Sequence, residues 1–89
     1  MELLPTEALE SIAEVMTFGA KKYGDHNWRN GLDWTRLVGS SMRHLSSWVG
    51  GEELDPESGL SHIAHLGANV LMLMTSIKLR LGKDTRWKK

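Results

Sequence analysis

Apolar side chains recur at helical spacing along most of this chain of 89 residues. In residues 6–23 they follow one another at intervals of three and four, which places them on one face of a helix. The same spacing returns in residues 33–49 and again in residues 56–81. No stretch shows the alternation of apolar and polar residues that is typical of a half-buried strand. The pattern therefore predicts an all-α fold with three main helices.

Residues that typically start and stop helices bound each of these segments. Thr6 and Asp33 are the predicted N-caps of the first two helices, and a glycine follows each of those helices. The third helix should begin near Pro56 or Ser58, because Asp55 followed by proline is typical of an N-cap and a first helical position. Another glycine follows the predicted end of this helix.

The third predicted helix has an apolar stretch, residues 70–74, that covers every side of the helix. A helix that is hydrophobic all round must be covered all round. A chain of 89 residues also buries a small core and is marginally stable alone. We therefore predict a small bundle of three helices that is completed by dimerisation. The alternative is a compact monomer whose loops cover the third helix.

Length and composition exclude several classes of protein. The chain has room for a single domain, residues 1–89, with a basic tail over about residues 82–89. Eleven basic residues balance eleven acidic ones, which disfavours binding to nucleic acid or to a membrane surface. Cysteine is absent, so disulfides, thiolate zinc sites and cysteine nucleophiles are excluded. Neither a spanning segment nor a signal-peptide pattern is visible, so we expect a cytoplasmic protein.

The strongest candidate site is a polar stripe on the third predicted helix, with an acidic loop before it. At 100° per residue the stripe residues fall within about 60° of one another. The stripe consists of Ser58, His62, His65 and Asn69, and the loop contributes Glu52, Asp55 and Glu57. The alternative is a merely solvated helix face, because the stripe lies about 140° from the main apolar face.

Two kinds of metal site fit these residues. Carboxylates with water hold Mg²⁺ or Mn²⁺, while the imidazoles bind phosphate oxygens, orient a water molecule or act as general base. Alternatively, the two histidines and a carboxylate bind a transition metal such as Zn²⁺. The candidate metal ligands are Glu52, Asp55, Glu57, His62 and His65.

A third histidine belongs to the candidate catalytic set, with His62 and His65. His44 follows Leu37 by seven residues, so it borders the apolar face of the second predicted helix. It completes a polar pocket if it faces the third helix. The alternative is a hydrogen-bonded interior histidine.

Other polar and aromatic residues suit a phosphorylated ligand. Two lysines end the first predicted helix, where they bind phosphates as point charges or simply favour the helix dipole. A tryptophan in the following loop is able to stack on a nucleobase. The candidate substrate-binding residues are Lys21, Lys22, Asn27, Trp28, Arg43 and Asn69.

Several short strings, in their order and spacing, resemble the N-terminal domain of phage-type dATP/dGTP diphosphohydrolases. That family is usually grouped near the all-α, MazG-like nucleotide pyrophosphohydrolases. The resemblance covers about residues 3–75. The strings are Leu3-Leu4-Pro5, Ala8-Leu9-Glu10, Phe18 to Gly24, Asn27-Trp28, Arg43-His44-Leu45, Trp48, Gly51-Glu52, Asp55, Glu57-Ser58-Gly59, His62 and His65-Leu66.

The resemblance implies hydrolysis of a purine deoxynucleoside triphosphate to a monophosphate and pyrophosphate. It also implies a divalent metal, Mg²⁺ first with Mn²⁺ or Co²⁺ as alternatives, a homodimer, and the host cytoplasm if the source is viral. MazG-like enzymes hold metal with Glu-x-x-Glu and Glu-x-x-Asp pairs, whereas this chain has His62-x-x-His65 at the comparable place. The competing hypothesis is a non-catalytic helical dimer that binds a nucleotide or a partner protein.

Overall fold

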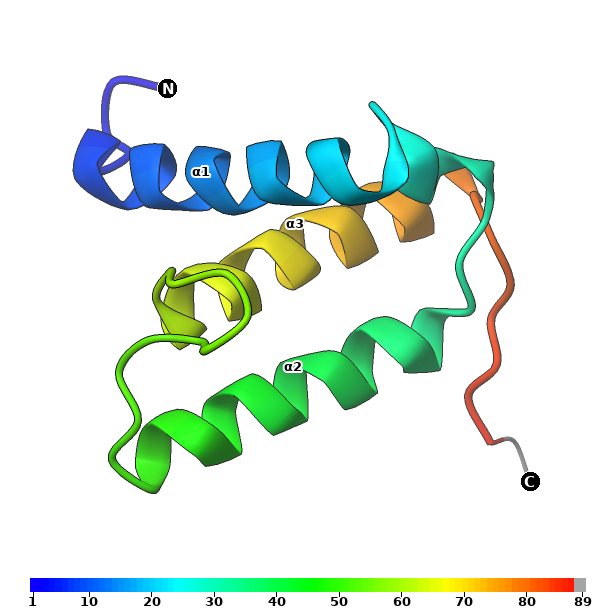
Figure 1. Ribbon diagram of the computed structural model, residues 1–89. Helices are drawn as coiled ribbons and strands as arrows, with labels where there is room; N and C mark the ends of the chain where they lie inside the picture. Colours follow the sequence, from blue (N-terminus) through cyan, green and yellow to red (C-terminus); the bar gives the residue numbers. More distant parts are fainter. Residues whose placement is uncertain (88–89) are drawn as a thin grey trace.

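The computed structural model describes residues 1–87 and confirms the all-α prediction (Figure 1). Its helices are α1 (Thr6–Tyr23), α2 (Trp34–Val49) and α3 (His62–Leu79), with a short 3₁₀ helix η1 (Asn27–Asn30) after α1. Lys88 and Lys89, which end the predicted basic tail, lie outside the described residues. Within residues 1–87, no helix is both long enough and apolar enough to cross a membrane.

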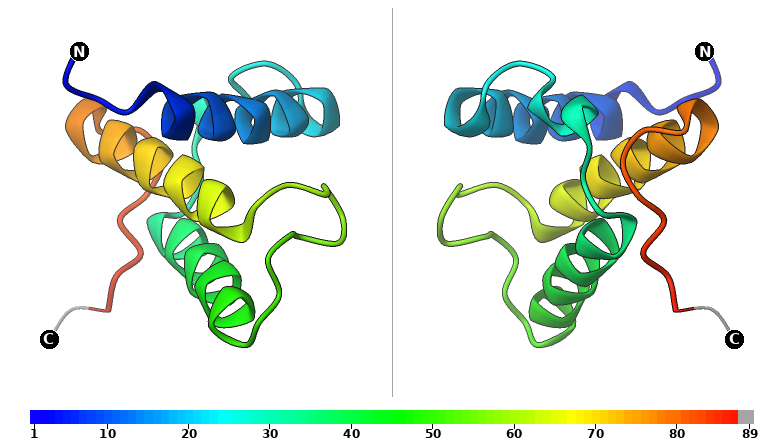
Figure 2. Two further views of the ribbon diagram at one scale, coloured as in Figure 1. Left: turned by 90° about the vertical axis from the view of Figure 1, so that its left-hand side faces the viewer. Right: turned by 90° about the vertical axis from the view of Figure 1, so that its right-hand side faces the viewer.

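Helix α3 lies between the other two helices and packs against both of them (Figures 1 and 2). The core between α1 and α3 is built on Val15, Ala64 and the fully buried Ala68. Gly67 adds to this close approach, because a Cβ at that position would lie 2.8 Å from the Ile12 side chain. Small residues on α3 therefore let α1 come near.

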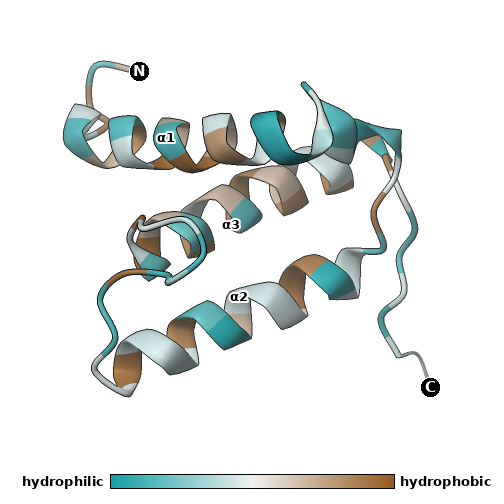
Figure 3. Ribbon diagram, in the orientation of Figure 1, coloured by the Kyte–Doolittle hydropathy of each residue, from teal (hydrophilic) through white to brown (hydrophobic). Residues whose placement is uncertain are grey.

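The side of α3 that is buried differs from the predicted apolar face. The apolar spacing in residues 56–81 predicts a main apolar face that includes Ile63, Val70 and Met74, yet these side chains are 39%, 43% and 62% exposed. Ala64 and Ala68, on another side, are the buried apolar residues. Since apolar residues are spread over several sides of α3, spacing alone does not reveal which side the neighbouring helices cover. Figure 3 shows hydrophobic and hydrophilic residues alternating along this helix.

Much apolar surface of α2 and α3 is exposed. Between these two helices runs a groove of about 240 Å³ whose lining is almost wholly apolar. The groove is lined by Val38, Ser41, Met42, Leu45, Leu66, Val70 and Leu73. The accessible surface of the chain is 6699 Å², against about 5,200 Å² expected for a monomer of 10.0 kDa. Dimerisation stays a prediction, and this groove is the surface where a second copy would pack.

The start of the third helix was predicted wrongly. Helix α3 begins at His62, and Ser61 is its N-cap, accepting hydrogen bonds from the backbone N–H groups of Ile63 and Ala64. Asp55 instead closes a tight loop, because its side chain accepts from the backbone N–H of Ser58 at 2.9 Å. Aspartate followed by proline serves a turn as well as a helix start, so the signal was ambiguous.

Smaller corrections concern the other helix ends. Helix α1 begins at Thr6 with Pro5 in the cap position, so Thr6 is not the N-cap. Asp33 does occupy the cap position of α2, without a side-chain hydrogen bond to the helix. Helix α3 ends at Leu79, followed by Arg80 in the left-handed region with a φ of 56°.

The described part of the basic tail packs on the start of α2 (Figure 1). The Trp34 indole N–H donates to the carbonyl of Leu81 at 2.8 Å, and the Trp34 backbone N–H donates to the carbonyl of Lys83 at 2.9 Å. The backbone N–H of Thr35 donates to the hydroxyl of Thr85 at 3.1 Å. These bonds tie the chain end to the bundle.

Candidate functional site

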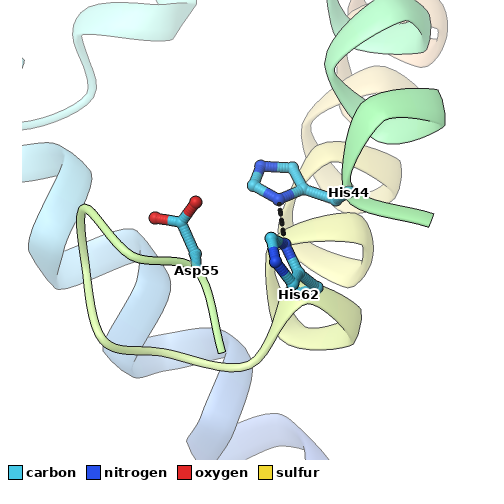
Figure 4. Close-up of side chains that lie close together, drawn as sticks. All are labelled: His44, Asp55 and His62. Atoms are coloured by element: carbon cyan, nitrogen blue, oxygen red, sulfur yellow. Dashed lines mark hydrogen bonds between the residues drawn. The ribbon is translucent and has the colours of Figure 1, made fainter. Parts of the chain in front are cut away.

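Three segments meet at the N-terminal end of α3. His62 is the first residue of that helix, His44 comes from the third turn of α2, and Asp55 comes from the loop between them (Figure 4). One ligand atom from each of the three lies within 4.8 Å of the others. The tight 55–60 loop positions the carboxylate, because its backbone bonds turn the chain back toward α3.

His62 is the most buried polar residue of this cluster, with 3% of its surface exposed. Its Nε2 lies 2.7 Å from Oε1 of Glu52, and its Nδ1 lies 2.9 Å from Nδ1 of His44. A carboxylate accepts, so Nε2 carries a proton and, in the neutral ring, the lone pair of Nδ1 faces His44. The stripe is therefore not a solvated face.

His65, one turn further along α3, completes the cluster. Its ring is stacked on that of His44, with 4.5 Å between centroids, and it meets the Phe18 ring edge-on at 6.4 Å. Its Nε2 lies 2.7 Å from the Ser58 hydroxyl and 3.9 Å from the Asp55 carboxylate. Ser58 thus joins the site as predicted, although it belongs to the loop and not to the helix.

The protonation of the cluster follows from its burial. Burial lowers the pKa of His44 below 6.5, and the neighbouring His65 lowers it further. Burial also lowers the pKa of His65, against the opposing effect of Asp55. Partial burial raises the pKa of Asp55, but hydrogen bonds from Ser58 and the nearby histidines outweigh this and bring it below 3.8. At neutral pH His44 and His65 are therefore neutral, and Asp55 is a carboxylate.

The group of His44, Asp55 and His62 fits a divalent metal ion. Imidazole nitrogens and a carboxylate oxygen are common metal ligands, and they bind metal in their unprotonated forms. The separation of 2.9 Å between the Nδ1 atoms of His44 and His62 suits neighbouring ligands, since two bonds of about 2.0–2.1 Å at right angles end about 2.9 Å apart. His44, predicted as catalytic only, thus joins the potential ligands.

Three of the five predicted metal ligands, Glu52, Glu57 and His65, lie outside the group of three donors. Glu52 contacts the outer nitrogen of His62, so it stands behind that ring. Glu57 pairs with Lys22, whose Nζ lies 2.6 Å from the carboxylate. This contact raises the pKa of Lys22 and ties the loop to α1. Asp55 and His62 belong to the group of three, and their role as metal ligands stays a prediction.

A wide-open cavity of about 440 Å³, closer to a surface depression than to an enclosed pocket, adjoins the cluster on its α1 side. It is lined by Phe18, Lys21, Lys22 and Glu57, and the edge-on contact between Phe18 and His65 connects it to the histidines. The two lysines thus lie where a ligand of the site could meet them. Phe18 was not predicted as a site residue, although it precedes the lysines by three and four positions and so shares their helix face.

The other predicted substrate-binding residues make no direct side-chain contact with the histidine rings. Asn69 donates from its side chain to the hydroxyl of Ser40 at 3.1 Å, which joins α3 to α2. Asn27 and Trp28 belong to η1, where the Arg29 guanidinium lies 4.9 Å from the Trp28 ring. Arg43 is exposed on α2. Among residues 1–87, no side-chain hydrogen bond or ring contact joins any of these four to a histidine ring.

Comparison with known proteins gives the family. The profile of the family described as dATP/dGTP diphosphohydrolase, N-terminal, matches residues 1–86. The chain belongs to this family. A curated relative, named dATP/dGTP diphosphohydrolase, comes from Salmonella phage PMBT28. The two are 31% identical over 88 residues, which cover 98% of this chain and 30% of the relative. The chain therefore spans less than a third of the relative's length. No solved structure matches the chain.

Proposed function

We propose that this dATP/dGTP diphosphohydrolase N-terminal domain hydrolyses purine nucleoside triphosphates, deoxynucleotides above all, to monophosphate and pyrophosphate with a divalent metal. The observation that carries the proposal is the convergence of His44, Asp55 and His62 within 4.8 Å, next to a cavity lined by two lysines. The phage relative is named for the hydrolysis of dATP and dGTP. Its name supports the substrate class.

His44, Asp55 and His62 would hold the metal. A divalent ion bound to phosphate offsets the charge that develops during hydrolysis and lowers the pKa of water. In the reaction a water oxygen bonds to the α phosphorus while the bond to the bridging oxygen breaks, and pyrophosphate leaves. We assign His65 as the general base, because its neutral ring accepts the proton that the water releases. The Ser58 hydroxyl orients this ring from 2.7 Å.

The cavity beside the cluster would hold the substrate. Lys21 and Lys22 supply ammonium groups for the phosphates, and Phe18 supplies an aromatic surface for a base. Lys22 is paired with Glu57, so phosphates that bind Lys22 compete with that carboxylate. Substrate binding would therefore break the pair between Lys22 and Glu57, which ties the loop to α1.

Pyrophosphate release from the eight common ribo- and deoxynucleoside triphosphates, each with Mg²⁺, Mn²⁺ and Co²⁺, tests the proposal. We expect release that depends on metal and is fastest with dATP and dGTP. His62→Ala and Asp55→Asn should each slow pyrophosphate release by at least about 100-fold. Circular dichroism should show that both variants keep the helix content of the unmodified chain. Glu53→Gln is the matched control, because only the backbone of Glu53 takes part in the loop. Full activity in both site variants would overturn the assignment.

A second candidate function is binding of a nucleotide without turnover. The chain matches 30% of its relative, so residues that perform the chemistry in that protein could lie in the other part. A folded chain that binds dGTP in calorimetry, yet releases no pyrophosphate with any metal, would establish this second function.

A further inference from the structure

The cation site has an unusual balance of ligands for an enzyme that acts on a nucleoside triphosphate. Two of its three donors are nitrogens, from His44 and His62, and one is a carboxylate oxygen, from Asp55. Mg²⁺ prefers oxygen ligands and usually keeps several waters. Imidazole suits Zn²⁺ and the other late first-row metals far better. The donor set thus favours a transition metal.

Glu52 adds a second observation. Its carboxylate is half exposed and lies 2.7 Å from Nε2 of the buried His62. This bond fixes the proton on Nε2 and turns the lone pair of Nδ1 toward His44. Metal-binding histidines in proteins almost always donate their other N–H to such a carboxylate or carbonyl, which orients the ring and increases its basicity.

The three donors also leave room for further ligands. Two histidines and one carboxylate on one side of an ion leave positions open for water or substrate oxygens. Structural zinc sites, by contrast, are closed by four protein ligands. In the described residues, His44, Asp55 and His62 are the group of three whose ligand atoms meet. Three protein donors are one fewer than a closed zinc site has, which indicates an open site.

We propose that the site selects a first-row transition metal, such as Mn²⁺, Co²⁺ or Zn²⁺, over Mg²⁺, and that Glu52 is the positioning residue that orients His62 toward the metal. The inference deepens the proposed function and rests on it for the role of the site. In this proposal Glu52 is not a metal ligand, because it accepts a hydrogen bond from the Nε2–H of one ligand, His62.

Titration of the chelator-treated 89-residue chain with each metal alone tests the inference without any hydrolysis. Calorimetry should show binding of one Co²⁺, Mn²⁺ or Zn²⁺ per chain, and a large excess of Mg²⁺ should not displace it. Visible absorption of bound Co²⁺ should report nitrogen ligands. His44→Ala should abolish binding. Binding of Mg²⁺ as tight as that of Co²⁺, or Co²⁺ binding unchanged in His44→Ala, would overturn the metal assignment.

Variants of the two adjacent glutamates test the positioning role. Glu52→Ala should weaken Co²⁺ binding by about 10–100-fold, as losses of such orienting partners do. Glu52→Gln keeps an acceptor for the Nε2 proton and should restore part of the affinity. Glu53→Ala is the control and should bind like the unmodified chain. Equal affinity in Glu52→Ala and Glu53→Ala would overturn the role of Glu52.

The outcomes separate this inference from the proposed function. Tight Co²⁺ binding without pyrophosphate release would leave the metal site standing and refute the hydrolysis. Hydrolysis supported by Mg²⁺, from a chain that does not bind Co²⁺ through His44, would refute the transition-metal site and leave the hydrolysis standing.

Discussion

The imidazole rings of His44 and His65 lie parallel, 4.5 Å apart between centroids and inclined by 8°. One ring belongs to α2 and the other to α3, so this stack joins the two helices beside the candidate metal site. Both rings are partly buried. Two protonated rings in this arrangement would repel each other, so the fold favours the neutral forms.

This stack predicts that the metal-free protein loses stability as the pH falls. The pKa values of His44 and His65 lie below 6.5 in the fold, so below about pH 6.5 the unfolded chain binds more protons than the folded one. Each histidine then removes up to about 1.4 kcal/mol of stability per pH unit. Urea unfolding with a chelator, from about pH 8 to about pH 5, measures the slope.

Histidine variants supply the control for that experiment. The double variant His44→Gln and His65→Gln should flatten the dependence of stability on pH in this range. His26→Gln changes an exposed residue in the loop after α1 and should keep the dependence. A slope that the double variant leaves unchanged would contradict the prediction.

The hydrogen bonds at the start of α3 predict that the Ser61 side chain stabilises the protein more than the Thr6 side chain does. Ser61 accepts hydrogen bonds from Ile63 and Ala64, so Ser61→Ala should cost about 1 kcal/mol and lower the Tm by about 4–8 °C. Thr6 makes no capping bond at α1, and Thr6→Ala should change the Tm by much less. Thermal melts followed by circular dichroism compare the two, and equal losses would argue against the Ser61 cap.

Gly82 is predicted to tolerate no side chain. Its φ is +73°, and a Cβ there would collide with the backbone of Leu32. Gly24 has a φ of +97° but open space around the added atom. Gly24→Ala should therefore cost the conformational term alone, roughly 1–2 kcal/mol, and Gly82→Ala roughly 2–5 kcal/mol. Urea unfolding of both variants measures the difference, and equal costs would refute the close contact.

The groove between α2 and α3 predicts a dimer. The chain exposes roughly 1,500 Å² more surface than a monomer of its mass, and a standard interface buries about 800 Å² per partner. The lining carries no charged residue, so a second copy of the same face would bury apolar surface without stranding a charge. Light scattering after size exclusion should give the mass of two chains.

Introducing a charge into the groove tests that prediction. Leu45→Glu places a carboxylate in the groove and should give a monomer, whereas Leu3→Glu changes a side chain that is already 94% exposed and should leave the dimer intact. A monomeric unmodified chain at micromolar concentration would rule the second copy out.

The three helices were predictable because their signals are local. The apolar spacing of residues 6–23 depends on neighbours three and four apart, and α1 spans the predicted range. The third helix was predicted to begin several residues too early. Asp55 and Pro56 suit a turn as well as a helix, and contacts made only in the folded chain favoured the turn.

Residue spacing alone predicts an all-α chain with three helices, and it identifies the acidic loop and the histidines as the polar centre. It could not assign roles within that centre. His44 and His62 are 18 positions apart, and their nitrogens meet only because α2 packs against α3. Glu52 and Glu57 were equivalent as acids. The tertiary structure placed one behind His62 and the other beside Lys22, since ligand geometry depends on distances that sequence spacing does not encode.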